Sequence, residues 1–229
     1  MINAVPALGT RDPTLTIPVL LVALRGLTRS VPPTEIAAAA GTYVANLLET
    51  QTYAALAECP ALAGYRALHA ERGKTGRQYL PAPESLLKRL FTRGEWRPLD
   101  PLVDAYSLVS LRTLVSIGAH DLARLSLPIN LTPTVGGESL LAIGDTTAQR
   151  LGANEYCYRD ARGQVLGRME CRQAQATQVR TSTRDVLFIL QGHAQLGGPA
   201  LHAAATQLLA SICSWVGPAT GGVSMTALD

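Results

Sequence analysis

The chain reads DPLVDAYSLVSLRTLVSIGAHDLARL over residues 100–125, and this stretch carries the clearest structural signals in the sequence. Over its first half, side chains of one face recur every three or four residues, which predicts a helix with one buried side. Asp100 is a residue type that caps helix N-termini, and Pro101 suits the first helical position. Gly118 interrupts the pattern, so we expect the helix to end before it. A one-turn helix capped by Asp121 is expected to follow.

The composition describes a globular chain with a mild positive charge. Its 229 residues are 47% apolar, which is enough for a sizeable core and argues against global disorder. The net charge is only +3, so any RNA contact is expected to be local and salt-sensitive. The apolar run 17–24 is too short to span a bilayer and contains Pro18, and no secretory signal is present. We therefore expect a cytoplasmic protein without membrane contact.

The order of the predicted elements indicates an α+β fold rather than a doubly wound sheet, because strands and helices do not alternate strictly. We expect a single domain over residues 1–229, with 1–60 and 195–229 as flanking elements. The predicted strands cover residues 14–24, 129–131, 140–143, 155–159, 165–171 and 185–190. The predicted helices cover residues 34–57, 61–70, 83–93 and 199–215, and the tail from residue 219 is expected to fray.

The cysteines and histidines do not predict a metal site or a disulfide. No C-x-x-C pair is present and the four histidines are scattered, so a structural zinc site is not expected. Cys157 and Cys171 lie on two predicted hairpin strands and could face each other. Free buried thiols in a reducing cytosol are the favoured interpretation.

A basic loop, ERGKTGRQYLPAP, covers residues 71–83 and has two interpretations of similar weight. Its charged side chains Arg72, Lys74 and Arg77 are candidates for phosphate contacts with RNA. The alternative is a solvated connection between two helices, which is a common role for such loops. The spacing of its glycines does not match a P-loop.

Five short motifs occur in an order that resembles a known family. They are LVDAYSLVSLR (102–112), GAHDLARL (118–125), YRDARGQVLGR (158–168), CRQ (171–173) and TRDVLF (183–188). Together they resemble the B3/B4 domain of the phenylalanyl-tRNA synthetase beta subunit, and most of all its freestanding relatives. The resemblance covers residues 62–191 well and the two ends poorly.

The resemblance implies a fold of layered β-sheets of unusual topology with helices packed outside. It also implies an activity, because this domain of the synthetase hydrolyses the ester that joins a wrong amino acid, tyrosine, to phenylalanine tRNA. That site positions water and the ester without a metal or other cofactor. This chain departs from the family pattern in four places. Ser107 replaces an Asn that is common there, and Met169-Glu170-Cys171 replaces an aromatic-rich segment of the freestanding relatives. Gln175 stands where the synthetase has a Glu, and Gly118 stands where it has a His, with His120 two residues on.

The candidates for the site are of two kinds. The candidates for catalysis, as a base or as groups that position water, are His120, Gln175 and Thr177. The candidates for contacts with a substrate are Glu138, Glu170, Arg172 and Gln173.

Each candidate also has a structural interpretation. Arg172 and Gln173 match the freestanding motif, which favours a functional role, whereas loop capping is favoured for Glu170. For His120 the alternative is a histidine at the start of a helix bonded to backbone. Gln175 cannot act as a base in place of the family's Glu.

Three functions from different classes fit these observations. The first is a freestanding hydrolase that deacylates mischarged tRNA in trans. The second is a repurposed pocket that binds or transforms a free amino acid or its derivative, which the changed pocket residues favour. The third is an RNA-binding module without catalysis. The expected partners are thus tRNA or an amino-acid-like small molecule.

Overall fold

The strand β2 (Val19–Leu24) lies at the centre of the fold, and all six of its side chains are buried. The structure is a computed structural model that describes residues 8–228. Side chains of a strand alternate between its two faces. Leu20, Val22 and Leu24 point to one hydrophobic cluster, while Val19, Leu21 and Ala23 point to another. A continuous apolar run of this kind is typical of a strand with both faces covered.

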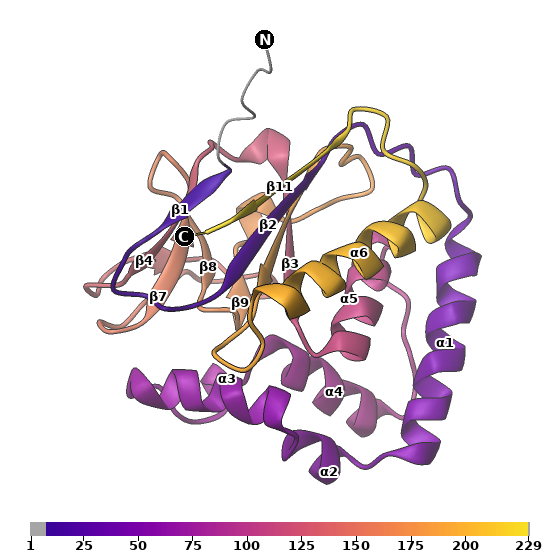
Figure 1. Cartoon of the computed structure of the whole chain (residues 1–229), viewed down its shortest axis with the longest axis horizontal. Coiled ribbons are helices and arrows are strands. Elements are labelled where there is room, and N and C mark those ends of the chain that lie inside the picture. Colours follow the sequence, from indigo (N-terminus) through magenta and orange to yellow (C-terminus); the bar gives the residue numbers. More distant parts are fainter. Residues whose placement is uncertain (1–7, 229) are drawn as a thin grey trace.

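Two main sheets and a layer of helices follow from this central strand (Figure 1). One sheet has the order β11-β2-β10-β3 and the other the order β1-β4-β7-β8-β9, with a small β5-β6 sheet beside them. The strands are β1 (Gly9–Arg11), β3 (Ser116–Asp121), β4 (Ile129–Pro133), β5 (Ser139–Leu140), β6 (Gln149–Arg150), β7 (Tyr156–Arg159), β8 (Val165–Arg168), β9 (Arg172–Gln173), β10 (Val186–Gln191) and β11 (Val223–Ala227). The helices are α1 (Pro33–Thr50), α2 (Tyr53–Ala57), α3 (Pro60–Glu71), α4 (Ala82–Arg93), α5 (Pro101–Thr113) and α6 (Gly198–Trp215).

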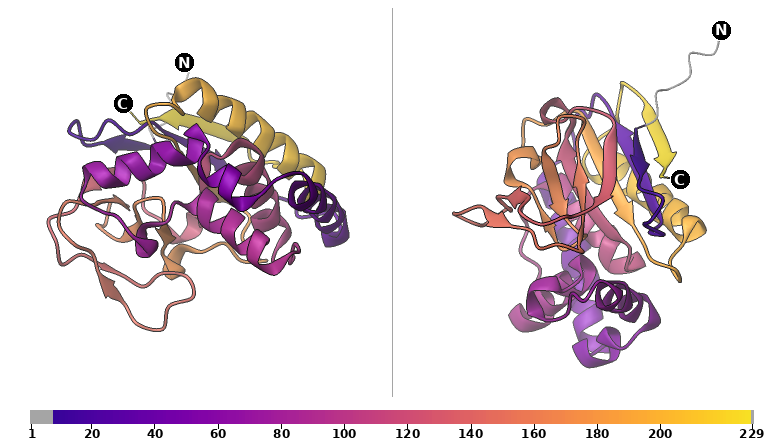
Figure 2. Two further views of the ribbon diagram at one scale, coloured as in Figure 1. Left: turned by 90° about the horizontal axis from the view of Figure 1, so that it is seen from below. Right: turned by 90° about the vertical axis from the view of Figure 1, so that its left-hand side faces the viewer.

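The fold has three layers: a layer of helices, then the four-stranded sheet, then the five-stranded sheet. Helices α5 and α6 cover the outer face of the four-stranded sheet and share a cluster with Val22 and Phe188. The five-stranded sheet covers the inner face through Leu131, Tyr156 and Tyr158. Helix α1 packs against α5 and α6. Helices α2, α3 and α4 lie below the edges of the two sheets (Figures 1 and 2). The predicted α+β class and the layered sheets with outer helices are confirmed.

The helix at residues 101–113 is confirmed, but the end of the opening stretch is not as predicted. Asp100 caps α5 by accepting a hydrogen bond from the Leu102 N–H, and Leu114 ends the helix in the left-handed conformation. The residues around Gly118, where we expected only the end of the helix, form strand β3. Pairing with β10 along its whole length stabilises this strand, and local spacing could not reveal such a distant partner. Asp121 caps the next one-turn helix, as expected.

Two further predictions need correction. The helix predicted over 34–57 is two helices, because Thr52 interrupts the first and caps the second. The tail predicted to fray forms β11 instead, which pairs with β2 from Val223 to Ala227. The four cysteines are free, but of the thiols expected to be buried only Cys157 is, whereas Cys213 is exposed. Within residues 8–228, no helix is both long enough and apolar enough to cross a membrane.

Candidate functional site

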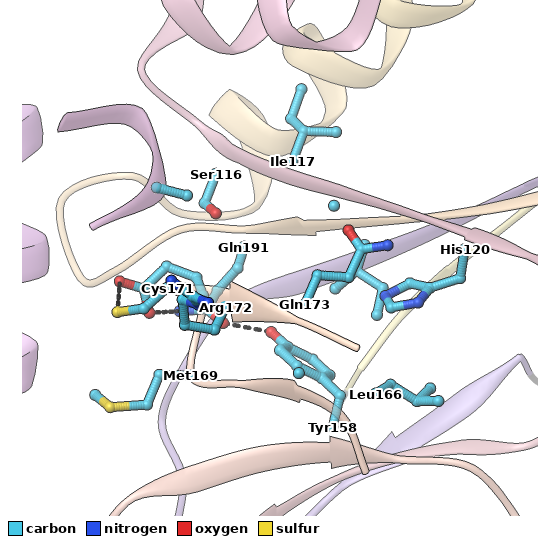
Figure 3. A pocket seen from close by; sticks show the side chains of 15 residues that line it. Ser116, Ile117, His120, Tyr158, Leu166, Met169, Cys171, Arg172, Gln173 and Gln191 are labelled. Carbon is cyan, nitrogen blue, oxygen red and sulfur yellow. Dashed lines mark hydrogen bonds between the residues drawn. The ribbon is translucent and has the colours of Figure 1, made fainter. Parts of the chain in front are cut away.

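A pocket of about 120 Å³ lies where β3 and β10 of one sheet approach β8 and β9 of the other (Figure 3). The start of α4 contributes Ala82 to its lining, and the turn after β8 contributes Met169, Glu170 and Cys171. Four candidates from the sequence line this pocket, and they are His120, Glu170, Arg172 and Gln173. Its lining therefore joins residues from both sheets.

His120 lies in strand β3 and not at the start of a helix. Its side chain is buried, and its Nδ1 atom lies 2.8 Å from Oγ1 of Thr177, another candidate for catalysis. Burial lowers the pKa of His120 to about 4, so the imidazole is neutral at pH 7. With Nδ1 engaged by Thr177, Nε2 is the nitrogen left for a ligand or a water in the pocket.

Arg172 and Gln173 form strand β9 at the edge of the pocket. The Nε2 atom of Gln173 donates to the carbonyl oxygen of Ala119 across 2.5 Å. The guanidinium of Arg172 lies 2.5 Å from the Asp145 carboxylate and remains 43% exposed. Gln173 is thus fixed between the sheets, whereas Arg172 keeps an exposed donor face.

Glu170 is not a loop-capping residue but the centre of a buried hydrogen-bond network. Its carboxylate is 2% exposed, and its Oε1 lies 2.5 Å from Nε2 of His69 on α3. Its Oε2 accepts hydrogen bonds from the Tyr156 hydroxyl at 2.5 Å and from Gln191 Nε2 at 3.1 Å. Tyr158 donates to the amide oxygen of Gln191, which extends this network along the pocket (Figure 3).

The charges of this network balance. Burial raises the pKa of Glu170, but the contacts with His69 and Tyr156 outweigh it and hold the pKa below its usual value. Burial lowers the pKa of His69, but the Glu170 carboxylate outweighs it and raises the pKa overall. The sequence did not reveal His69 or Gln191, because they lie about a hundred and about twenty residues from Glu170 and belong to no local motif.

The other candidates lie outside the pocket. Gln175 is exposed in a short 3₁₀ turn, and Glu138 forms an ion pair of 2.7 Å with Arg159 beside a different hollow. In the basic loop, Lys74 lies 3.7 Å from the buried Glu155 carboxylate and is mostly covered. Arg77 is exposed and Arg72 is half-buried, and neither lines the pocket.

A larger cleft of about 380 Å³ adjoins the pocket between α4, α5 and the linker that joins them. Pocket and cleft share Ala82, Ile117 and Gln173. The cleft is also lined by the side chains of Arg89, Arg93, Trp96 and Arg97. Within residues 8–228, no carboxylate lies within ion-pair distance of Arg89 or Arg93, so both charges are available to an anion.

Comparisons with known proteins identify the family of this chain. The family model of the B3/4 domain matches residues 66–196, which is more than half of the chain, and the chain belongs to the B3/4 domain family. Among solved structures, it is similar to an N-terminal fragment of the phenylalanyl-tRNA synthetase beta-subunit from Pyrococcus horikoshii, at 16% identity and a TM-score of 0.45. That match covers 57% of this chain and 44% of the fragment. No curated protein matches the chain. The resemblance predicted from the motifs is confirmed.

Proposed function

We propose that this protein hydrolyses, in trans, the ester bond between an amino acid and the end of a mischarged tRNA. The observation that carries the proposal is the pairing of two compartments. A small pocket holds polar groups from both sheets, and a larger cleft adjoins it at Gln173. In this cleft Arg97 is paired with Glu95, whereas Arg89 and Arg93 have no ion-pair partner within residues 8–228. An aminoacyl ester has the same two parts, which are a compact acyl group and an anionic nucleotide.

The proposed chemistry needs little from the protein, because an aminoacyl ester is already activated. Water held by His120 adds to the carbonyl carbon, and the bond from that carbon to the ribose oxygen breaks. The proton lost by the water ends on the ribose oxygen, while Gln173 or Arg172 orients the ester. An imidazole with a pKa of about 4 is a weak base at neutral pH, so it can hydrogen-bond a water molecule but does not keep a proton taken from that water. We therefore assign His120, with Thr177 fixing its ring, the task of positioning the water. Gln175 and Glu138 have no part in this proposal.

Deacylation of a panel of aminoacyl-tRNAs tests the proposal. The expected result is turnover of at least one mischarged species well above spontaneous hydrolysis, reduced by His120→Ala and retained by His202→Ala. His202 is exposed on α6, away from the pocket, and serves as the matched control. Folded protein without turnover of any species would overturn the proposal. Binding of a free amino acid under those conditions would favour the repurposed pocket instead.

A further inference from the structure

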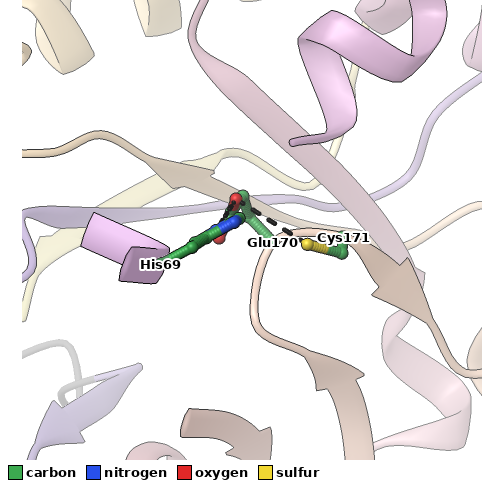
Figure 4. Close-up of side chains that lie close together, drawn as sticks. All are labelled: His69, Glu170 and Cys171. Carbon is green, nitrogen blue, oxygen red and sulfur yellow. Dashed lines mark hydrogen bonds and ion pairs between the residues drawn. The ribbon is translucent and has the colours of Figure 1, made fainter. Parts of the chain in front are cut away.

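We propose that His69, Glu170 and Cys171 form a zinc site beside the pocket. Their three potential ligand atoms, Nε2, Oε1 and Sγ, all lie within 4.8 Å of one another (Figure 4). His69 comes from α3, and the other two residues form the turn between β8 and β9. Local spacing does not indicate this site, because His69 lies about a hundred residues before Glu170 and Cys171.

A hydrogen bond at Nδ1 fixes the orientation of the His69 ring, so that Nε2 is the nitrogen facing Glu170 and Cys171. Nδ1 lies 2.8 Å from the Tyr79 carbonyl oxygen, which can only accept, so Nδ1 carries the proton. Nε2 lies 2.5 Å from Oε1 of Glu170, and in this buried ion pair the two atoms share a proton. A cation bound between them takes the place of that proton, and Sγ of Cys171 lies within 4.8 Å of both atoms as a third ligand.

The outer contacts of these ligands match those of known metal sites. A ligating histidine usually donates its other N–H to a carbonyl or carboxylate, as His69 does to Tyr79. The Glu170 carboxylate is held through Oε2 by Tyr156 and Gln191, which leaves Oε1 for an ion. Both ligand orientations are thus fixed by groups that need not move when an ion binds.

Distances and charge favour zinc. Ligands of a tetrahedral zinc with bonds of about 2.0–2.3 Å lie roughly 3.3–3.7 Å apart. Oε1 and Sγ of Cys171 are 3.9 Å apart, and Nε2 and Oε1 must separate by less than about 1 Å to fit such a site. A dication with one thiolate, one carboxylate and a neutral imidazole is neutral overall, which suits a buried place. Imidazole and sulfur ligands select zinc over magnesium or calcium.

The proposed ion has a position left for an exogenous ligand. Glu170 and Cys171 both line the pocket, whereas His69 lies behind them. Three protein ligands with an open fourth position are typical of zinc sites that bind a water or a substrate group. Zinc binding by these residues is independent of ester hydrolysis, and it is measured without any substrate.

Metal content tests the site. Untagged protein incubated with zinc and dialysed is expected to retain about one zinc per chain, and Cys171→Ser and His69→Asn less than about 0.1. Cys213→Ser removes an exposed thiol of α6 and is the matched control, which retains the full content. Wild-type protein with less than about 0.1 zinc per chain would overturn the proposal, and so would equal zinc in Cys171→Ser.

Cobalt substitution identifies the ligands even where a variant does not fold. Wild-type protein and Cys213→Ser loaded with cobalt are expected to show the near-ultraviolet band of thiolate-to-cobalt charge transfer and the visible bands of a tetrahedral ion. Bound cobalt without the thiolate band would show that Cys171 is no ligand and would overturn this set. Failure of the deacylation assay leaves these spectra unchanged, so the two proposals fail separately.

Discussion

Gln173 and Ala119 join the two sheets beside the pocket. The side-chain amide of Gln173, from β9, donates to the backbone carbonyl of Ala119 in β3. The same side chain lines the pocket and the cleft. Apart from the chain neighbours of Gly118, its Oε1 is the only heavy atom of residues 8–228 within 4 Å of the place where a Cβ on Gly118 would lie. Gly118 is therefore an open position in the pocket lining, and the distance of 3.6 Å is ordinary van der Waals contact.

Gly118→Val is expected to fill the pocket and leave the fold intact. Valine favours strands, and Gly118 does not adopt a positive φ. We expect kcat/KM for the responsive aminoacyl-tRNA to fall by about tenfold or more, because the added methyl groups occupy the space of the acyl group. Gly118→Ala is the matched control with a smaller loss. Unchanged turnover in Gly118→Val, with an unchanged thermal melt, would show that the substrate binds elsewhere.

Thr177→Val is expected to lower kcat more than it changes KM. The substitution keeps the shape of the side chain and removes the hydroxyl that contacts His120 Nδ1. The buried ring loses its partner, at a cost in stability of about 1–3 kcal/mol. Steady-state kinetics and urea denaturation measure the two effects. A rise in KM alone would contradict a role in holding water.

The pH profile of deacylation provides a separate check on His120. Because its pKa is lowered to about 4, the ring stays neutral over the range where an ordinary histidine titrates. We compare kcat/KM of the wild type and of His120→Gln between pH 5 and 8, after correction for spontaneous hydrolysis. We expect the two profiles to have the same shape, with no inflection that belongs to His120. An inflection near pH 6.5 that disappears in His120→Gln would contradict the buried, neutral imidazole.

Local signals predicted much of the fold. The cap at Asp100, the hairpin of β7 and β8 and the buried strand β10 were all evident in spacing and residue type. Strands β3 and β11 were missed because their formation depends on pairing with distant strands. Strand β11 has alternating half-exposed side chains and few large apolar residues, so nothing local distinguishes it from a loop.

The site was predictable only in part, for a related reason. The segment around residues 170–173 was predicted as part of the site because it carries a family motif, and the structure places it at the pocket. His69 and Gln191 reach the same place from α3 and β10, and only the tertiary fold brings them together. Gln175 was predicted as a site residue from an alignment with the family sequence, but it lies in a short 3₁₀ turn and does not line the pocket.

Arg29 links three segments, and Arg29→Met is expected to destabilise the fold. Its guanidinium lies 2.9 Å from the carboxylate of Asp100, the cap of α5, and donates to the carbonyl oxygens of Arg180 and Thr183. Both side chains of the pair are mostly buried, so removal of one leaves a charge unpaired. We expect a loss of about 2–3 kcal/mol in the free energy of unfolding, measured by urea denaturation.

The exposed pair of Arg97 and Glu95 serves as the control for Arg29. Arg97→Met breaks a contact of similar length, 2.7 Å, but its side chains are more than half exposed. The expected change is below about 0.5 kcal/mol. Equal effects of the two substitutions would show that burial does not decide the strength of these pairs.

Asp104 is expected to make the fold less stable as pH rises, and Asp104→Asn isolates this effect. Burial raises the pKa of Asp104 to about 6, although its carboxylate accepts from the Leu99 N–H. The folded state therefore holds a proton that the unfolded chain releases near pH 4, and stability is lost as pH rises from about 4 to 6. Asparagine keeps an acceptor for Leu99 and has no charge to bury. Urea denaturation of both proteins between pH 4 and 7 should show the variant gaining about 1–2 kcal/mol relative to wild type over that interval. His120 contributes to both proteins equally and drops out of the difference, so a gap that stays constant with pH would show that folding does not raise the pKa of Asp104.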